Sequence, residues 1–197
     1  MSILPPRLVL VRRETELDRV RATYPSLATA RFLLEQRGLS LAAVEDAHRE
    51  FAEVIRRVRA VVPPDWRQAT IMRAEVERFV FAPDDIVLAV GQDGLVANVA
   101  KYLDGQTVIG VDPAPGRNAG KLVRFSVFEV EEALGDAAAR RLPIERRVMA
   151  EARLDDGVSL LALNEIFVGH RSHQSARYTL AIEGARERQS SSGLIVA

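Results

Sequence analysis

The sequence contains no cysteine among its 197 residues. It can therefore form no disulfide framework, no thiolate nucleophile and no zinc site with cysteine ligands. Any chemistry that the protein performs must use oxygen or nitrogen groups, or a hard cation.

The chain also lacks an excess of charge of either sign, because 27 Lys and Arg residues balance 27 Asp and Glu residues. No block of Lys and Arg is longer than a pair. Nucleic acid and anionic membranes attract proteins through a one-sided positive field, which this composition does not provide. We therefore expect neither as a partner.

Long hydrophobic runs are missing as well, and none approaches the roughly 20 residues that a bilayer span needs. Pro5, Pro6 and Arg7 interrupt the start of the chain, where a signal peptide would need an apolar stretch. Hydrophobic residues still make up 48% of the sequence, enough for a sizeable core. We expect a soluble, cytoplasmic, globular protein.

The first third of the chain predicts one strand followed by helices. The branched apolar run within residues 7–13 is typical of a buried strand, and Thr15 gives a helix-start signal. Apolar spacing predicts a helix over residues 17–37, interrupted near Pro25. A second helix should begin after a Ser40 cap and run to about Val61, before two prolines stop it.

The middle of the chain predicts a parallel βαβ unit. Residues 66–81 contain a strand whose ends the pattern does not define. Residues 86–90 are a fully buried strand, 91–94 a tight turn, 95–103 a helix and 108–111 the next strand. In such units the turn lies at the carboxyl edge of the sheet, where ligands bind.

Beyond a Pro/Gly-rich loop at residues 113–120 and a helix at 127–140, the pattern becomes extended. Turn signals at 155–157 and 183–184 predict hairpins. The expected strands lie within residues 144–154, 158–169, 176–183 and 193–197. The fold class is thus α/β: a Rossmann-like nucleotide-phosphate-binding domain with a parallel sheet at 1–142, followed by a mainly antiparallel β domain at 143–197.

Asp93 is the residue in this pattern that is best placed for chemistry. It lies in a glycine-flanked turn between a buried strand and a helix, and Gly91 and Gly94 permit close approach of a phosphate to backbone amides. Its carboxylate could accept a proton from an attacking hydroxyl, or orient that hydroxyl. Taken alone, the Gly-x-Asp-Gly pattern also occurs in ordinary turns, where the aspartate hydrogen-bonds local amides.

Three segments together resemble the NAD kinase family. Residues 85–95, DIVLAVGQDGL, are similar to the segment that carries the family's Gly-Gly-Asp-Gly-Thr motif. Residues 161–168, LALNEIFV, resemble its Asn-Glu or Asn-Asp motif, and residues 192–197, SGLIVA, resemble the stretch before its third motif. Order and spacing agree from about residue 85 onward, whereas the first 80 residues match only in general α/β character.

The resemblance implies a two-domain enzyme that moves a phosphoryl group from ATP, or from polyphosphate in some members, to the 2′-hydroxyl of NAD. It implies a divalent cation such as Mg²⁺, and a homodimer or homotetramer. On this reading Asp93 is the base or hydroxyl-orienting residue, and Gly91 and Gly94 shape the phosphate-facing loop. Asn164 and Glu165 would hold the adenosine and ribose of the nucleotide.

The sequence departs from the family pattern at two motif positions, and it ends where the third motif would begin. Gln92 replaces the second glycine and Leu95 replaces the threonine. The remaining substrate-binding residues are expected in a segment that would follow Ala197. The alternative function is a non-catalytic nucleotide-binding or regulatory homologue, in which Gln92 and Leu95 mark a lost activity.

Three other groups have plainer interpretations. His170 and His173 follow a strand in an expected solvated loop and have no convincing third metal ligand. Asp84 and Asp85 are expected to form a turn before the buried strand. The loop residues Arg117, Asn118 and Lys121 are interpreted equally well as phosphate contacts or as exposed surface.

Overall fold

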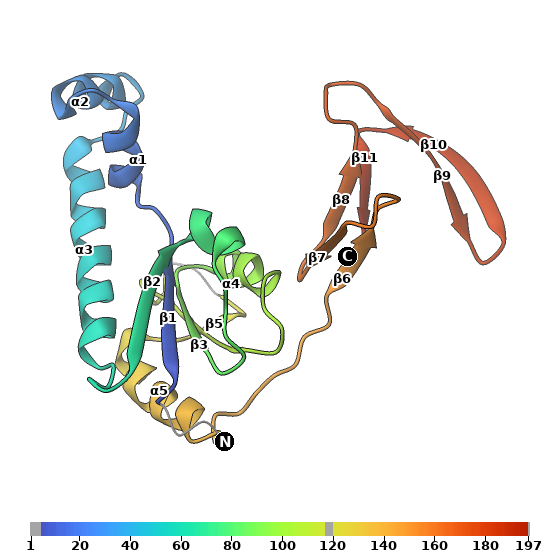
Figure 1. Cartoon of the computed structure of the whole chain (residues 1–197). Helices are drawn as coiled ribbons and strands as arrows, with labels where there is room; N and C mark the ends of the chain where they lie inside the picture. Colours follow the sequence, from blue (N-terminus) through green and yellow to red (C-terminus); the bar gives the residue numbers. More distant parts are fainter. Residues whose placement is uncertain (1–4, 117–119, 197) are drawn as a thin grey trace. The chain divides into compact units, whose positions relative to one another are not determined.

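A computed structural model describes residues 5–116 and 120–196, and Arg117 and Asn118 lie outside the described residues. The chain divides into two compact units, residues 1–144 and 145–197. Figure 1 draws the first unit from blue to yellow and the second in orange and red.

The first unit is built on a parallel sheet with the strand order β2-β1-β3-β4-β5. All four neighbouring strand pairs are parallel. The strands are β1 (Arg7–Arg12), β2 (Arg67–Met72), β3 (Ile86–Val90), β4 (Thr107–Val111) and β5 (Val123–Phe125). This arrangement confirms the predicted α/β fold class and the βαβ unit at its centre.

Helices connect these strands. They are α1 (Glu16–Thr23), α2 (Leu27–Gln36), α3 (Leu41–Ala60), α4 (Asp93–Ala100) and α5 (Val130–Ala138), with short 3-10 helices η1 (Arg73–Arg78) and η2 (Val127–Glu129). The oxygens of Thr15, Ser26 and Ser40 cap α1, α2 and α3 by accepting amide hydrogen bonds three residues ahead. In the described part of the chain, no helix combines the length and the hydropathy needed to cross a membrane.

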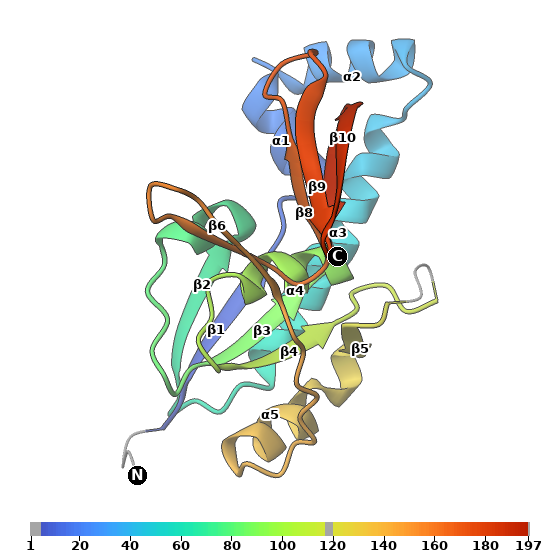
Figure 2. The ribbon, with the colours of Figure 1, turned by 90° about the vertical axis from the view of Figure 1, so that its right-hand side faces the viewer.

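Both faces of the sheet are covered, because successive side chains of a strand point to opposite sides. Leu8 and Leu10 of β1 pack in one apolar cluster with residues of α3 and α5. Val9 and Val11 pack in another with residues of η1 and α4. Figure 2 shows the helices lying on the sheet in this way. The first unit is therefore a three-layer α/β domain.

Helices α1 and α2 lie beyond the carboxyl edge of the sheet, beside the amino end of α3 (Figures 1 and 2). They form a small core of their own with α3, made of Leu17, Val20, Ala30, Leu34 and Leu41. Pro25 separates the two helices, as the sequence predicts, and Gly38 follows α2 with a left-handed φ of 70°. Residues 16–60 thus supply one long helix along the sheet and a helical extension beyond its carboxyl edge.

Two details of the first unit differ from the prediction. Helix α4 begins at Asp93 and not at Leu95, so the catalytic candidate belongs to the first helical turn. Strand β5 was not predicted, because its three residues carry too short a pattern to read. Its pairing with β4 places residues 121–125 next to the turn that follows β3.

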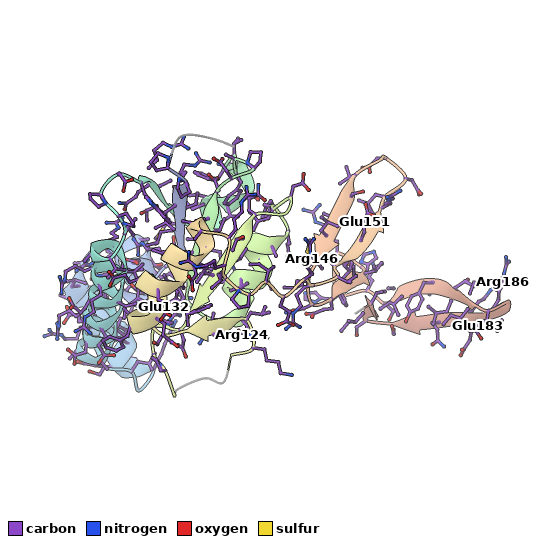
Figure 3. The ribbon with its side chains drawn as sticks, turned by 90° about the horizontal axis from the view of Figure 1, so that it is seen from below. Arg124, Glu132, Arg146, Glu151, Glu183 and Arg186 are labelled. Carbon is purple, nitrogen blue, oxygen red and sulfur yellow. The ribbon has the colours of Figure 1, made fainter. Side chains whose placement is uncertain are left out.

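The second unit consists of three antiparallel strand pairs, which confirms the predicted β character. The strands are β6 (Ala150–Arg153), β7 (Ser159–Ala162), β8 (Ile166–Gly169), β9 (Ala176–Ile182), β10 (Ala185–Ser191) and β11 (Gly193–Val196). The pairs are β6–β7, β8–β11 and β9–β10. Figure 3 shows Glu183 and Arg186 at the tip of the β9–β10 hairpin, where Glu183 and Gly184 both have positive φ.

A buried ion pair joins the start of β1 to the segment before β3. Asp85 is 2% exposed and its carboxylate accepts hydrogen bonds from Nε and Nη2 of Arg7, at 2.8 and 2.6 Å. It also accepts one from the amide of Ala82, while the Arg7 guanidinium lies over the ring of Phe79. The predicted turn role of Asp85 is therefore confirmed, with an added ion pair that the sequence pattern does not show.

We predict that Asp85→Ala lowers the free energy of unfolding by about 3 kcal/mol, because it leaves a partly buried guanidinium without its partner. Urea denaturation of the purified chain measures this change. Asp84→Ala is the matched control, since Asp84 is exposed and adjacent, and it should change stability by less than about 0.5 kcal/mol. Equal effects of the two substitutions would contradict the structural role of the ion pair.

Candidate functional site

The carboxyl ends of β1 and β3 form the natural binding edge of the sheet. From β1 the chain continues to β2 on one side of this pair, and from β3 it continues to β4 on the other side. In open α/β sheets, ligands bind at such a point, where the strand order reverses. The turn after β3 contains Gly91 and Gln92, and it leads directly into α4.

A pocket of about 530 Å³ opens at this edge. It is lined by residues that follow three different strands and by one side of α4. They are Arg13, Glu14 and Arg19 after β1, Arg73, Ala74 and Glu77 after β2, and Gln92, Gly94, Leu95, Asn98 and Tyr102 after β3. The sequence analysis identified Gly94 but not the arginines, because these are distributed over 60 residues with no local motif.

Three arginines line the pocket together with two glutamates, Glu14 and Glu77, so the charged side chains of the lining carry both signs. The guanidinium of Arg13 lies 5.8 Å from the ring centre of Phe51 on α3, and Arg19 forms a 2.6 Å ion pair with Glu16. Arg73 is exposed at the start of η1. Arginine and the amino end of a helix are both typical phosphate-binding elements. The pocket thus contains groups that can bind an anion.

Asp93 holds the segment that leads into β5. Its Oδ2 accepts a hydrogen bond from the amide of Lys121 at 2.8 Å. Its Oδ1 accepts from the amides of Leu122 and Val123, at 2.9 and 3.1 Å. One carboxylate therefore receives three successive backbone amides, and it connects the start of α4 to the strand two places along the sheet.

These amides also control the charge of Asp93. Burial alone would raise the pKa of its carboxyl group, but the three amide hydrogen bonds and the nearby charge of Lys121 together lower the pKa below its ordinary value of 3.8. Asp93 is consequently ionised at neutral pH. Because a lowered pKa makes the carboxylate a weaker base, Asp93 is better suited to accepting a hydrogen bond from a hydroxyl than to removing its proton.

Two glycines make the close packing around Asp93 possible. A Cβ at Gly120 would lie 2.9 Å from Oδ1 of Asp93 and 2.3 Å from the side chain of Val123. A Cβ at Gly110 on β4 would lie 2.2 Å from the carbonyl oxygen of Leu122. Either side chain would push residues 120–123 away from the carboxylate. By contrast, a Cβ at Gly94 would point into open space, with no neighbouring atom within 4 Å. Because Gly94 lines the pocket and has no side chain, the amino end of α4 is open toward the pocket.

The two departures from the family pattern are accommodated without strain. Gln92 has φ −110° and ψ 169°, an extended conformation that any residue adopts, and its side chain is exposed at the pocket. Leu95 is 4% exposed and packs in the apolar cluster of the α4 face. A Cβ at Gly91 would approach Leu95 to 3.0 Å. Gln92 therefore adds an amide group to the pocket, and Leu95 packs in the core.

The other predicted site residues lie in the second unit. Asn164 and Glu165 are exposed in the connection between β7 and β8, and their binding role stays a prediction. His170 lies in a loop, as predicted, where its Nδ1 accepts a hydrogen bond from the amide of Ser172. Among the described residues, no group of three or more His, Asp or Glu side chains is arranged to hold a metal ion.

Comparison with known proteins identifies the architecture. No protein-family model and no curated protein matches the chain. Among solved structures, it is similar to the crystal structure of yeast NADH kinase complexed with NADH, with 13% sequence identity and a TM-score of 0.53. The match covers 98% of this chain and 57% of the yeast chain. The chain has an NAD kinase-like fold.

The NAD kinase-like fold agrees with the family resemblance of the sequence at the level of architecture. Because the identity is low, the similarity establishes the fold and leaves the roles of single residues open. The chain spans little more than half of the yeast kinase. The parallel domain with its Gly-x-Asp-Gly turn and the antiparallel domain that follows are the two parts of the fold that it contains.

We predict that the Asp93 contact is lost only in acid. A depressed folded-state pKa stabilises the fold above the unfolded-state value near 3.8, and this stabilisation disappears as the pH falls through the folded-state pKa. NMR titration should show the amide shifts of Lys121, Leu122 and Val123 moving together, with a midpoint below 3.8. In Asp93→Asn this transition should be absent, and a midpoint at or above the ordinary value would contradict the amide contacts.

Proposed function

We propose that the chain is an NAD kinase-like phosphotransferase, or its phosphate-binding portion. The reaction transfers the γ-phosphoryl group of ATP to the 2′-hydroxyl of NAD, or to a related nucleotide or sugar hydroxyl. The observation that carries the proposal is the position of the arginine-lined pocket against the Gly-x-Asp-Gly turn of an NAD kinase-like fold.

The pocket suits the phosphoryl donor. Arg13, Arg19 and Arg73 supply positive charge, and the amino end of α4 adds backbone amides beside Gly94. Phosphoryl transfer depends mainly on positioning and on neutralising charge, so it requires few protein groups. The volume of about 530 Å³ is in the range of small-molecule ligand sites.

Asp93 suits the acceptor. An ionised carboxylate offers about four lone-pair sites, and the three amides occupy two on Oδ1 and one on Oδ2. One site on Oδ2 is left to accept a hydrogen bond from an attacking hydroxyl. Asp93 does not line the pocket, whereas its neighbours Gln92 and Gly94 do. Donor and acceptor would thus contact the same short turn through different residues.

The family resemblance implies a divalent cation as a partner of the phosphates. Mg²⁺ is usually held by one or two carboxylates together with substrate oxygens, and does not require a cage of protein ligands. Glu14 and Glu77 are the carboxylates that line the pocket, and they would hold the cation there. When bound, the cation would neutralise charge on the transferring phosphoryl group.

The remaining assignments follow the family resemblance. Asn164 and Glu165 would bind the adenosine and ribose of the acceptor, as exposed residues between two strands of the β unit. A homodimer or homotetramer is the expected assembly.

The decisive experiment incubates the purified chain with ATP, Mg²⁺ and either NAD or NADH, and measures the phosphorylated dinucleotide. Asp93→Asn should lower the rate at least about a hundredfold, because it removes the carboxylate that orients the hydroxyl. Asp84→Asn is the control at the opposite edge of the sheet and should keep the wild-type rate. Saturable nucleotide binding without turnover would instead favour the non-catalytic homologue.

We further predict that Arg73→Ala weakens ATP binding about tenfold, as loss of one charge-assisted phosphate contact implies. Isothermal titration calorimetry measures this effect. Arg67→Ala is a matched control, because Arg67 begins the strand whose carboxyl end precedes Arg73 and is also exposed. The pocket is wrongly assigned if both variants bind ATP as tightly as the wild type.

A further inference from the structure

Two arginines of the pocket depend for their position on the helical extension. Arg13 lies in the irregular link between β1 and α1, and Arg19 lies in α1 itself. Arg13 directly follows the last residue of β1, and Arg19 lies seven residues beyond that strand. The contacts of this link and of α1 therefore contribute to where the two guanidinium groups lie.

The polar contact between this link and α3 is made through the hydroxyl of Thr15, beside the apolar packing of α1 on α3. This residue caps α1: its Oγ1 accepts a hydrogen bond from the amide of Asp18 at 3.2 Å, and its own amide donates to Oδ2 of Asp18 at 3.0 Å. The same Oγ1 lies 2.7 Å from Nδ1 of His48, in the middle of α3. Thr15 is only 7% exposed, so water competes little for this contact. One hydroxyl thus joins the first turn of α1 to α3.

The Thr15 hydroxyl can bind His48 in either direction. Its Oγ1 accepts one hydrogen bond from the Asp18 amide and keeps one proton and one lone pair, so it can donate to Nδ1 of His48 or accept from it, depending on the imidazole tautomer. The Asp18 carboxylate faces His48 at 3.9 Å and Arg12 at 3.8 Å. These groups form a polar joint between the end of β1, α1 and α3.

The next turn of α3 contacts Arg13, at the β1 end of the link between β1 and α1. Phe51 follows His48 by three residues, on the same side of α3, and it packs against the guanidinium of Arg13. Phe51 is 7% exposed and belongs to the apolar cluster under the sheet. His48 and Phe51 together place α3 against both Thr15 and Arg13.

We propose that His48 is a positioning residue for the phosphate pocket. It is not one of the residues that line the pocket, and it acts by holding Thr15, and through it the Arg13 link and α1, at the carboxyl edge of the sheet. The inference rests on the proposed function insofar as it assigns Arg13 to phosphate binding. It extends that function by making the helical extension part of the binding site.

The test measures ATP binding to the full chain by calorimetry, alone and in a double-mutant cycle. His48→Leu should weaken binding about fivefold to tenfold, which is about 1 to 1.4 kcal/mol. In an Arg13→Ala background the same change should have little further effect, because the residue that it positions is gone. His48→Asn should restore most of the affinity, since its side-chain amide can accept from or donate to the Thr15 hydroxyl from a position near Nδ1.

His170→Leu is the matched control, because His170 is exposed and bonded only within its own loop. Wild-type affinity for His48→Leu, or fully additive effects of His48→Leu and Arg13→Ala, would overturn the proposal. Circular dichroism and thermal unfolding of each variant confirm that it is folded.

A second readout separates this inference from the proposed function. Amide hydrogen exchange in residues 13–19 should become faster in His48→Leu and remain unchanged in His170→Leu. Unchanged exchange in His48→Leu would overturn the positioning role, whatever the chain binds. Failure of the wild-type chain to bind ATP would refute the proposed function, and the exchange experiment would still decide whether His48 holds the link.

Discussion

Burial of the two central strands on both faces is the constraint on which the first unit depends. Every residue of β3 is buried, as are four successive residues of β1. Strands of this kind require helices on both sides, and parallel pairing requires each connection to return to the same edge. The loops after β1, β2 and β3 are thereby collected at one edge. The pocket and the Asp93 turn are consequences of this arrangement.

The structural role of Asp93 is compatible with the chemical role that we propose for it. Its carboxylate satisfies three amides that would otherwise lack partners, which is the ordinary work of an aspartate in a turn. The same contacts keep it ionised and fix its orientation. The plain and the functional interpretations of the Gly-x-Asp-Gly turn are therefore compatible, since a residue that orients a hydroxyl must itself be held.

Local patterns predicted most of the elements. The capping signals at Thr15 and Ser40, the break at Pro25 and the buried run of β3 depend on neighbours in sequence, and each appears in the structure. Strand β10 was missed because its residues, ARERQSS, lack an apolar face. Its pairing with β9 is instead set by the two-residue turn at Glu183 and Gly184.

The site was predicted less completely than the fold. Gly91, Asp93 and Gly94 form a contiguous motif, whereas Arg13, Arg19 and Arg73 converge only after three strand connections have been folded. No spacing rule links residues that far apart. The three amides that bind Asp93 were equally hidden, because they depend on a pairing between β4 and β5 that is only a few residues long.

The packing of β5 against β4 has a consequence for recognising homologous sequences. Position 110 has no room for a side chain, because the Leu122 carbonyl oxygen occupies that space. A homologue with a larger residue there would have to displace the backbone that binds its aspartate. Glycine at positions 110 and 120 together with aspartate at 93 thus forms a discontinuous signature. A homologue that has all three residues would be expected to retain this geometry, even where the motif around the aspartate has diverged.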